Sequence, residues 1–252
     1  MNKKLIYSIL IFLLACGNIQ SSSAQNTPYV DDKLLHFGFF LELDMPSYLI
    51  EEVDSLEQLQ APFADGHVYH PRTSAVGAGF AAGFITDLRL TRHLNLRFTP
   101  ALHFGERTIT YKSYTNTNIQ GSQSGMTNKI SVLTIPVTIP LYLKWSAERE
   151  GNYRPYVIAG GGVELECFRP KDKVILHKPF DAFVSAGFGC DFYFRWFKFC
   201  PEIKYQIGFL DAHISTMEVE KEGWQLSRPD YFYSNAIGRM THQRISIAFN
   251  FE

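Results

Sequence analysis

Apolar and polar residues alternate with a period of two along most of this chain of 252 residues. One example is KISVLTIPVTIPLYLKW, residues 129–145, in which every second position from Leu133 to Trp145 is apolar. A period of two places successive side chains on opposite faces of a β-strand. Eight such segments occur: Leu34–Asp44, Ala75–Asp87, Leu94–Phe104, Lys129–Trp145, Arg154–Phe168, Phe180–Arg195, Phe197–Phe209 and Thr241–Phe251. They predict an all-β fold with eight strands.

The connections between these segments alternate in length. Short turns lie near Leu90, Gly151 and Trp196. The other links are long and polar, and they are Met45–Thr73, Gly105–Asn128, Arg169–Pro179 and Asp211–Met240. Short turns at one end and long loops at the other are typical of an outer-membrane barrel, with periplasmic turns and extracellular loops. We therefore expect an eight-stranded antiparallel transmembrane β-barrel with both termini in the periplasm.

A soluble barrel such as a lipocalin is the structural alternative, and it would place its apolar residues inside. Here one parity class is nearly all apolar, and the other holds charges of both signs: Arg97, Lys144, Glu164, Asp181, Asp191, Lys198, Glu202, Lys204 and Arg244. Charges can pair inside a narrow lumen, since unpaired charges there would be costly. A whole apolar belt facing water would exceed the roughly few hundred Å² that a soluble monomer tolerates. We therefore expect lipid outside and a plug of salt bridges inside.

Aromatic residues support the same topology. Trp145, Tyr153, Phe194, Trp196 and Phe197 gather around the predicted short turns, where an interfacial girdle is expected. Phe251 is next to last in the chain, which fits the C-terminal aromatic signal of outer-membrane barrels. Both features favour a membrane barrel.

The N-terminus predicts export. Lys3 and Lys4 precede the apolar run from Leu5 to Ala15, and Ser22-Ser23-Ala24 presents small residues where a signal peptidase cleaves. We expect a signal peptide over residues 1–24, a short periplasmic segment over 25–33 and the barrel domain over 34–252. Lipidation at Cys16 is an alternative, although Leu14 stands where a small residue is usual.

Two prolines interrupt the fourth predicted strand. Pro136 and Pro140 share the inward parity, so they remove two donors from the ladder with one neighbouring strand and none from the other. The pair predicts a weakened seam or bulge on one side of the strand only. Of the cysteines after residue 24, parity places Cys190 outside and Cys200 inside, and we expect both, with Cys167, to be free thiols.

Several motifs could carry chemistry, and each has a simpler interpretation. The string GAGFAAG, Gly77–Gly83, lacks the strand before and helix after that a dinucleotide loop requires. Asp65, His67 and His70 have a metal-like spacing without a visible fourth ligand. The remaining candidates for catalysis are His36, His93, His103 and Ser185, which no motif joins into a pair. We predict no catalytic, cofactor-binding or metal-binding residues and no cofactor, and the protein is expected not to be an enzyme.

Two blocks resemble a known family. TIPVTIPLYLKWSAEREGNYRPYVIAGGG is similar to a hairpin of outer-membrane barrels from the Bacteroidetes. Phe197-Lys198-Phe199 followed by Pro201-Glu202-Ile203-Lys204-Tyr205 resembles the PorT family of the type IX secretion and gliding-motility apparatus. The resemblance covers roughly Leu34 to Phe251. It implies an integral outer-membrane component, without catalytic residues, that is needed to export proteins with C-terminal secretion signals.

Two functional hypotheses follow for a barrel of this kind. The first is a type IX secretion component whose partners are outer-membrane lipid and other secretion-apparatus proteins. The second is a small structural, adhesin-like or lipophilic-ligand-binding barrel that acts through its extracellular loops. A formal net charge of −1 gives no electrostatic argument for nucleic acid, and no small-molecule substrate is identified.

Overall fold

A computed structural model describes residues 30–54, 67–72, 77–115, 126–167, 178–214 and 233–252. A short 3-10 turn, η1 (Val30–Asp32), precedes the strands. The strands are β1 (Leu35–Glu52), β2 (His67–Arg72), β3 (Gly79–Arg89), β4 (Leu94–Phe98), β5 (Ala101–Thr115), β6 (Met126–Thr134), β7 (Pro136–Ser146), β8 (Tyr153–Glu166), β9 (Phe180–Tyr193), β10 (Lys198–Gly208) and β11 (Ile237–Phe251). Among these residues, no helix is long and apolar enough to cross a membrane.

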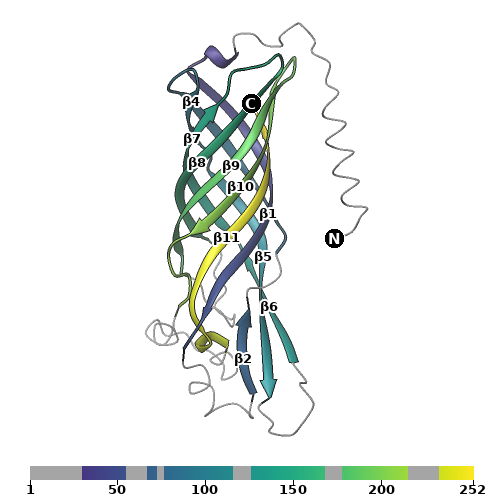
Figure 1. The fold of residues 1–252 in the computed structure, drawn as a ribbon, viewed down its shortest axis with the longest axis vertical. Helices are drawn as coiled ribbons and strands as arrows, with labels where there is room; N and C mark the ends of the chain where they lie inside the picture. Colours follow the sequence, from purple (N-terminus) through teal and green to yellow (C-terminus); the bar gives the residue numbers. More distant parts are fainter. Residues whose placement is uncertain (1–29, 55–66, 73–76, 116–125, 168–177, 215–232) are drawn as a thin grey trace, which may run out of the picture.

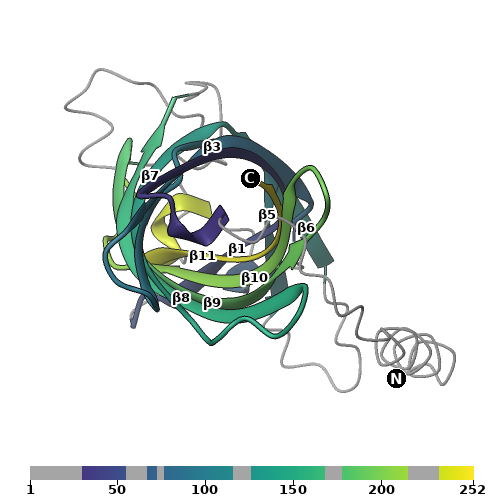
Figure 2. The same cartoon turned by 90° about the horizontal axis from the view of Figure 1, so that it is seen from above.

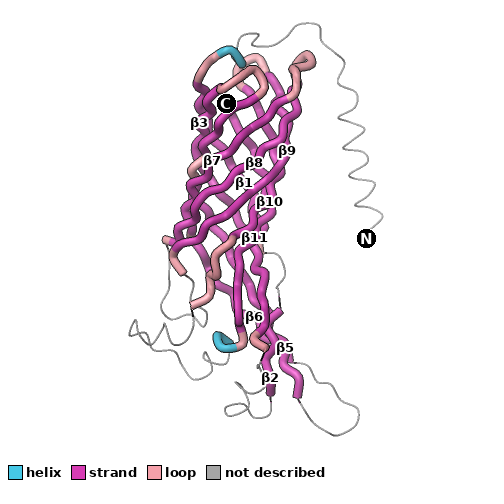
Figure 3. The backbone as a smooth tube through the Cα atoms, turned by 60° about the vertical axis from the view of Figure 1, so that its left-hand side comes forward, coloured by secondary structure: helices cyan, strands magenta, loops and turns pink. Residues whose placement is uncertain are grey.

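The strands close into an antiparallel ring of eight members. Their order is β1, β11, β10, β9, β8, β7, β4 and β3, and pairing of β3 with β1 completes the circle. β5 continues the line of β4, since both pair with β3 and β7. Figure 2 shows the closed ring from above, and Figure 3 shows the tilt of its strands. The predicted eight-stranded antiparallel barrel is confirmed.

One end of the barrel carries an extension that the periodicity did not predict. β5 continues past Gly105 and pairs there with β6 on one edge and β2 on the other. These three strands project beyond the ring at the end opposite the short turns (Figure 1). β1 and β11 also pair further than expected, as far as Glu52 and Ile237. The prediction of loops over Met45–Thr73, Gly105–Asn128 and Asp211–Met240 was therefore wrong for the residues that lie in these strands. The single strand predicted over Lys129–Trp145 is divided between β6 and β7.

The side chains divide between outside and inside as predicted. The outward face exposes large apolar residues, among them Phe37 and Phe84 at 69% and 73% exposure. All nine predicted inward charges are buried: Arg97, Lys144, Glu164, Asp181, Asp191, Lys198, Glu202, Lys204 and Arg244. The aromatic residues near the short turns are exposed, with Trp196 at 84%. This distribution suits a barrel surrounded by lipid.

β8 departs from strict alternation of polar and apolar residues. Its register is continuous with β7 and with β9. Tyr156 and Ile158 nevertheless lie inside, at 3% and 2% exposure, where they pack with Tyr142 and Cys200. The lumen thus holds an apolar layer between charged groups.

The prolines of β7 weaken one seam, as predicted. β7 pairs with β8 without a break from Pro136 to Ser146. On its other side the pairing stops between Phe98 and Ala101, opposite Pro140, and resumes for only two residue pairs. Pro100 lies in the same gap and directs its carbonyl to the other neighbour, accepting from the amide of Phe84. The interruption is therefore confined to one side of β7.

Hydrogen exchange in detergent micelles should detect this seam. We expect amides of residues 99–104 to exchange at least about tenfold faster than those of residues 157–163, because fewer ladder bonds hold them. Pro140→Ala restores one donor and should slow the exchange of residues 99–104. Equal protection of the two segments would contradict the assignment.

Inward glycines make room for aromatic side chains. A Cβ on Gly83 would lie 2.6 Å from the ring of Phe40, and one on Gly160 would lie 2.7 Å from the ring of Tyr142. Real Cβ atoms do not approach so closely, so these rings can lie across the lumen only where the facing residue is glycine. Crowding in a narrow lumen thus accounts for these glycines.

Candidate functional site

The lumen is filled by paired charges near the short-turn end. Arg97 is the central residue of this charged cluster and is 1% exposed. Its guanidinium donates to Asp87 at 2.9 Å and to Glu252 at 2.6 Å, and it lies 3.5 Å from Glu202. The hydroxyl of Tyr156 donates to the same Glu202 at 2.7 Å. These contacts join β3, β4, β8, β10 and the C-terminal residue across the barrel.

Two lysines complete this cluster. Lys144 Nζ donates to both oxygens of Asp191 at 2.8 Å. Lys198 Nζ lies 2.5 Å from Glu252 and 4.0 Å from Asp191. Every one of these charged groups is buried and paired, so the predicted salt-bridge plug is confirmed.

A second cluster lies toward the long-loop end. Glu164 accepts from Arg107 at 2.8 Å, from Arg244 at 3.1 Å and from Gln206 at 3.0 Å. Arg107 is 1% exposed and its guanidinium lies 5.3 Å from the ring of Tyr48. Arg107 lies in a stretch predicted to be a loop, so it was not among the predicted inward charges. The sequence holds only a weak signal for it, because Ile109 and Tyr111, which share its parity, alternate with polar residues over only a short stretch.

A cluster of buried apolar residues, here called the apolar cap, lies beyond this second cluster, with its Tyr48 against Arg107. Its buried members are Tyr48, Ile109, Tyr111, Ala212, Ala236, Ile237 and Met240. The hydroxyl of Tyr111 donates to the carbonyl of Tyr233 at 3.0 Å, which ties β5 to the segment before β11. Along the described residues, the lumen thus holds ion pairs, polar groups and this cap.

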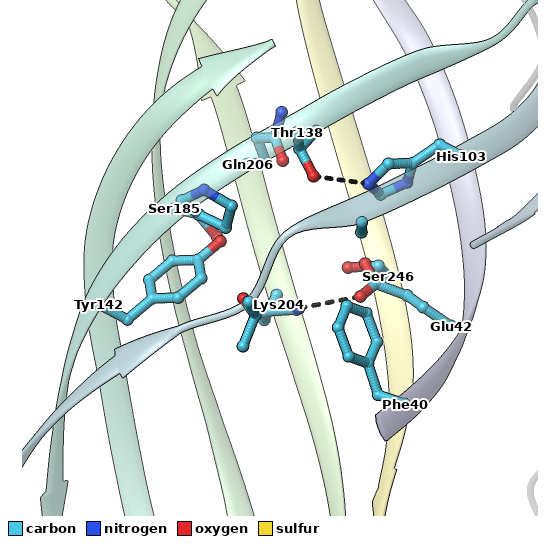
Figure 4. A pocket seen from close by; sticks show the side chains of 12 residues that line it. Phe40, Glu42, His103, Thr138, Tyr142, Ser185, Lys204, Gln206 and Ser246 are labelled. Carbon is cyan, nitrogen blue, oxygen red and sulfur yellow. Dashed lines mark hydrogen bonds and ion pairs between the residues drawn. The ribbon is translucent and has the colours of Figure 1, made fainter. Parts of the chain in front are cut away.

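A small polar cavity lies between the two charged clusters, behind the weakened seam (Figure 4). Lys204 crosses it to donate to Glu42 at 2.9 Å. His103 lies between Asp44, whose oxygen is 2.6 Å from Nδ1, and Thr138, whose hydroxyl is 2.9 Å from Nε2. The space left for water is about 10 Å³, which is enough for one water molecule.

The Asp44 carboxylate, the His103 imidazole and the Thr138 hydroxyl form a hydrogen-bonded series, in the order of groups found in activated nucleophiles. Asp44, His103 and Thr138 come from β1, β5 and β7, and all three are buried. The Thr138 hydroxyl accordingly faces a cavity with room for about one water molecule. We interpret the series Asp44–His103–Thr138, here called the clamp, as a structural link that joins β1, β5 and β7.

The predicted catalytic candidates do not come together. Ser185 lines the cavity with His103, but the hydrogen bonds of His103 go to Asp44 and Thr138. His36 lies at the short-turn mouth, and the Nδ1 of His93 lies 3.1 Å from the carbonyl of Ser146. Asp44 and Thr138 could not be identified from the sequence as partners of His103, because they lie 59 and 35 residues away from it.

The clamp should contribute to stability. His103→Ala leaves the buried Asp44 carboxylate without its nearest partner. We therefore expect the free energy of unfolding to be about 3 kcal/mol lower than in the wild type. His70→Ala is the matched control, because His70 pairs with Glu52 at 3.1 Å in a partly exposed position, where such a pair is worth about 0–1 kcal/mol. Urea titration in lipid vesicles measures both, and equal losses would contradict the clamp.

The other motifs also have structural outcomes. Asp65 lies outside the described residues, whereas His67 and His70 lie in β2. Within the described part of the chain, no group of three potential ligands is close enough to hold a metal ion. Cys167, Cys190 and Cys200 are free thiols, as predicted. Cys200 is buried and Cys190 half-buried, in line with the inward and outward parity predicted for them, and Cys167 is exposed.

Comparison with known families matches residues 24–213 to the outer membrane protein beta-barrel domain. That span covers more than half of the 252-residue chain. The chain belongs to the outer membrane protein beta-barrel domain family. The outward apolar face and the membership agree on an outer-membrane β-barrel in a lipid environment. The matched residues end before β11, which in this chain pairs with β1 and β10 and so belongs to the ring.

Among solved structures, the chain is similar to the crystal structure of Neisserial surface protein A (NspA). The two share 8% identity with a TM-score of 0.38, over 86% of this chain and 98% of that chain. No match was found among curated proteins.

Proposed function

We propose that this outer-membrane barrel is a non-catalytic component of the type IX protein secretion apparatus, needed for export of proteins with C-terminal secretion signals. The observation that carries the proposal is the filled lumen, in which Arg97 alone contacts three carboxylates. A barrel closed in this way does not serve as a conduit for protein. It acts through contact with other proteins of the apparatus.

The family resemblance supports the choice of apparatus. The block from Phe197 to Tyr205 resembles the PorT family, and in the structure it forms β10 with the turn before it. Its inward residues, Lys198, Glu202 and Lys204, take part in the buried ion pairs. We further propose that the short turns and both termini are periplasmic and that the mature chain begins at Gln25.

Export can be measured directly in a strain that lacks this chain. We expect a reporter with a C-terminal secretion signal to remain in the periplasm, and the wild-type chain supplied in trans to restore its export. A strain complemented with an unrelated eight-stranded barrel serves as the control for general outer-membrane damage. Unchanged export without the chain would overturn the proposal.

The extension of β2, β5 and β6 favours a second candidate function. It places three paired strands beyond the ring on the long-loop side, where loops of such barrels commonly contact ligands. In this case the protein is a small structural, adhesin-like or lipophilic-ligand-binding barrel. Replacing the extension by a short turn would then abolish function while export of other proteins continues.

A further inference from the structure

The short-turn mouth of the barrel is lined by arginines that the turns themselves hold in place. Arg154 donates through Nε to the carbonyl of Ala147 at 2.8 Å and through Nη2 to the carbonyl of Arg92 at 2.6 Å. Arg149 donates to the carbonyl of Gly151 at 2.9 Å and its guanidinium lies 3.6 Å above the ring of Tyr193. Each guanidinium is thus fixed by contacts other than an ion pair.

Three donors of this mouth lie around one carboxylate, that of Asp31. Asp31, in η1, accepts from the hydroxyl of Tyr193 at 2.8 Å, and the Nη1 atoms of Arg149 and Arg154 lie 3.9 and 3.8 Å from it. Asp32 pairs with Arg89 at 3.0 Å. Figure 2 shows η1, in purple, within the outline of the ring. Asp31 and Asp32 therefore occupy a site whose side chains come from β3, from β8 with the turn before it, and from β9.

Cationic groups continue inward from this site. The cavity beside Asp31 is also lined by Arg89, Arg92, Lys144 and Lys198, and by the carboxylate of Asp191, which pairs with the two lysines. Arg92 is 76% exposed in its side chain, and its ion pair with Glu148 is 3.9 Å long. An exposed pair of that length contributes little. The ion pairs of Asp31 with Arg149 and Arg154 are as long, at 3.9 and 3.8 Å, and Asp32 is 67% exposed in its pair with Arg89. Another carboxylate can therefore replace Asp31 or Asp32 at small cost.

We propose that the short-turn mouth is a binding site for an acidic peptide segment of a partner protein, and that Asp31 and Asp32 occupy it when the partner is absent. The match is one of charge and spacing: adjacent carboxylates on one turn meet Tyr193, two preset arginines and Arg89. The N-terminal segment then acts as an internal competitor. This inference rests on the proposed function only in taking the partner to be a protein, and its test does not involve secretion.

Binding of a labelled peptide to the purified barrel in detergent tests the proposal. The probe is YVDDKLL, the sequence of residues 29–35, and its control is YVNNKLL. Asp31→Asn with Asp32→Asn vacates the site, and we expect this barrel to bind YVDDKLL at least about tenfold more tightly than the wild type, because a tethered competitor has a high effective concentration. Asp54→Asn, which removes an exposed carboxylate beyond the other end of β1, should leave binding at the wild-type level.

Further variants identify the site itself. Tyr193→Phe, made in the vacated barrel, removes one hydroxyl and should weaken binding of YVDDKLL severalfold while the barrel remains folded by its gel mobility. Arg149→Gln with Arg154→Gln should abolish it. Equal binding of the two peptides, or binding that these variants leave unchanged, would overturn the proposal. So would displacement of the peptide by an equal concentration of inorganic phosphate, which would indicate a small-anion site.

Discussion

Replacing Arg97 by methionine is expected to lower the free energy of unfolding by about 3–5 kcal/mol, or to prevent folding altogether. The substitution keeps most of the side-chain volume but leaves Asp87, Glu202 and Glu252 buried without their shared cation. An uncompensated buried carboxylate costs far more than the lost packing. Urea unfolding in phospholipid vesicles gives the difference.

Arg89→Met is the matched control for this variant. Arg89 is also paired with a carboxylate, Asp32, but the two side chains are 27% and 67% exposed. We expect a loss of at most about 1 kcal/mol there. If Arg97→Met does not fold, Asp87→Asn provides a milder change in the same cluster, and it should still destabilise more than Arg89→Met. Wild-type stability of both cluster variants would contradict the role assigned to the ion pairs.

Placing a charge on the lipid face should have the second large effect. Ile203 lies in the middle of β10, is 43% exposed and points away from the lumen. Ile203→Arg is expected to cost about 2–4 kcal/mol in a bilayer, the penalty of a cation near the midplane. The same change at Ser131, an exposed residue of β6 in the extension, should cost about 0–1 kcal/mol. Equal costs at the two positions would mean that water, and not lipid, surrounds β10.

The periodicity predicted the ring because lipid and lumen impose opposite demands on alternate residues. Every predicted strand contributes to the ring, although residues 129–134 of the fourth form β6 in the extension. The inward charges from Arg97 to Arg244 are buried. The prolines of β7 could be interpreted for the same reason, since parity alone decides which neighbour loses a donor. These features depend on local pattern, which the sequence displays directly.

The extension and the partners of the lumen groups could not be predicted in this way. Outside the lipid both faces of a strand can be polar, so β2 and the far half of β5 gave no strong alternation. The pairing of Arg97 with Glu252 joins residues 155 positions apart, and it depends on strand register. The docking of Asp31 against Tyr193 spans 162 positions. Long-range contacts of this kind depend on the strand register of the closed ring, which the local sequence pattern does not specify.

The central claim is that the lumen is closed and that the barrel acts by contact. Conductance of the purified protein in planar lipid bilayers tests it most directly, because a continuous water-filled path carries ions whatever its function. We predict no stepwise ion conductance for the wild type, since both charged clusters and the apolar cap fill the lumen. Stable, reproducible conductance steps from the folded wild-type barrel would contradict the account.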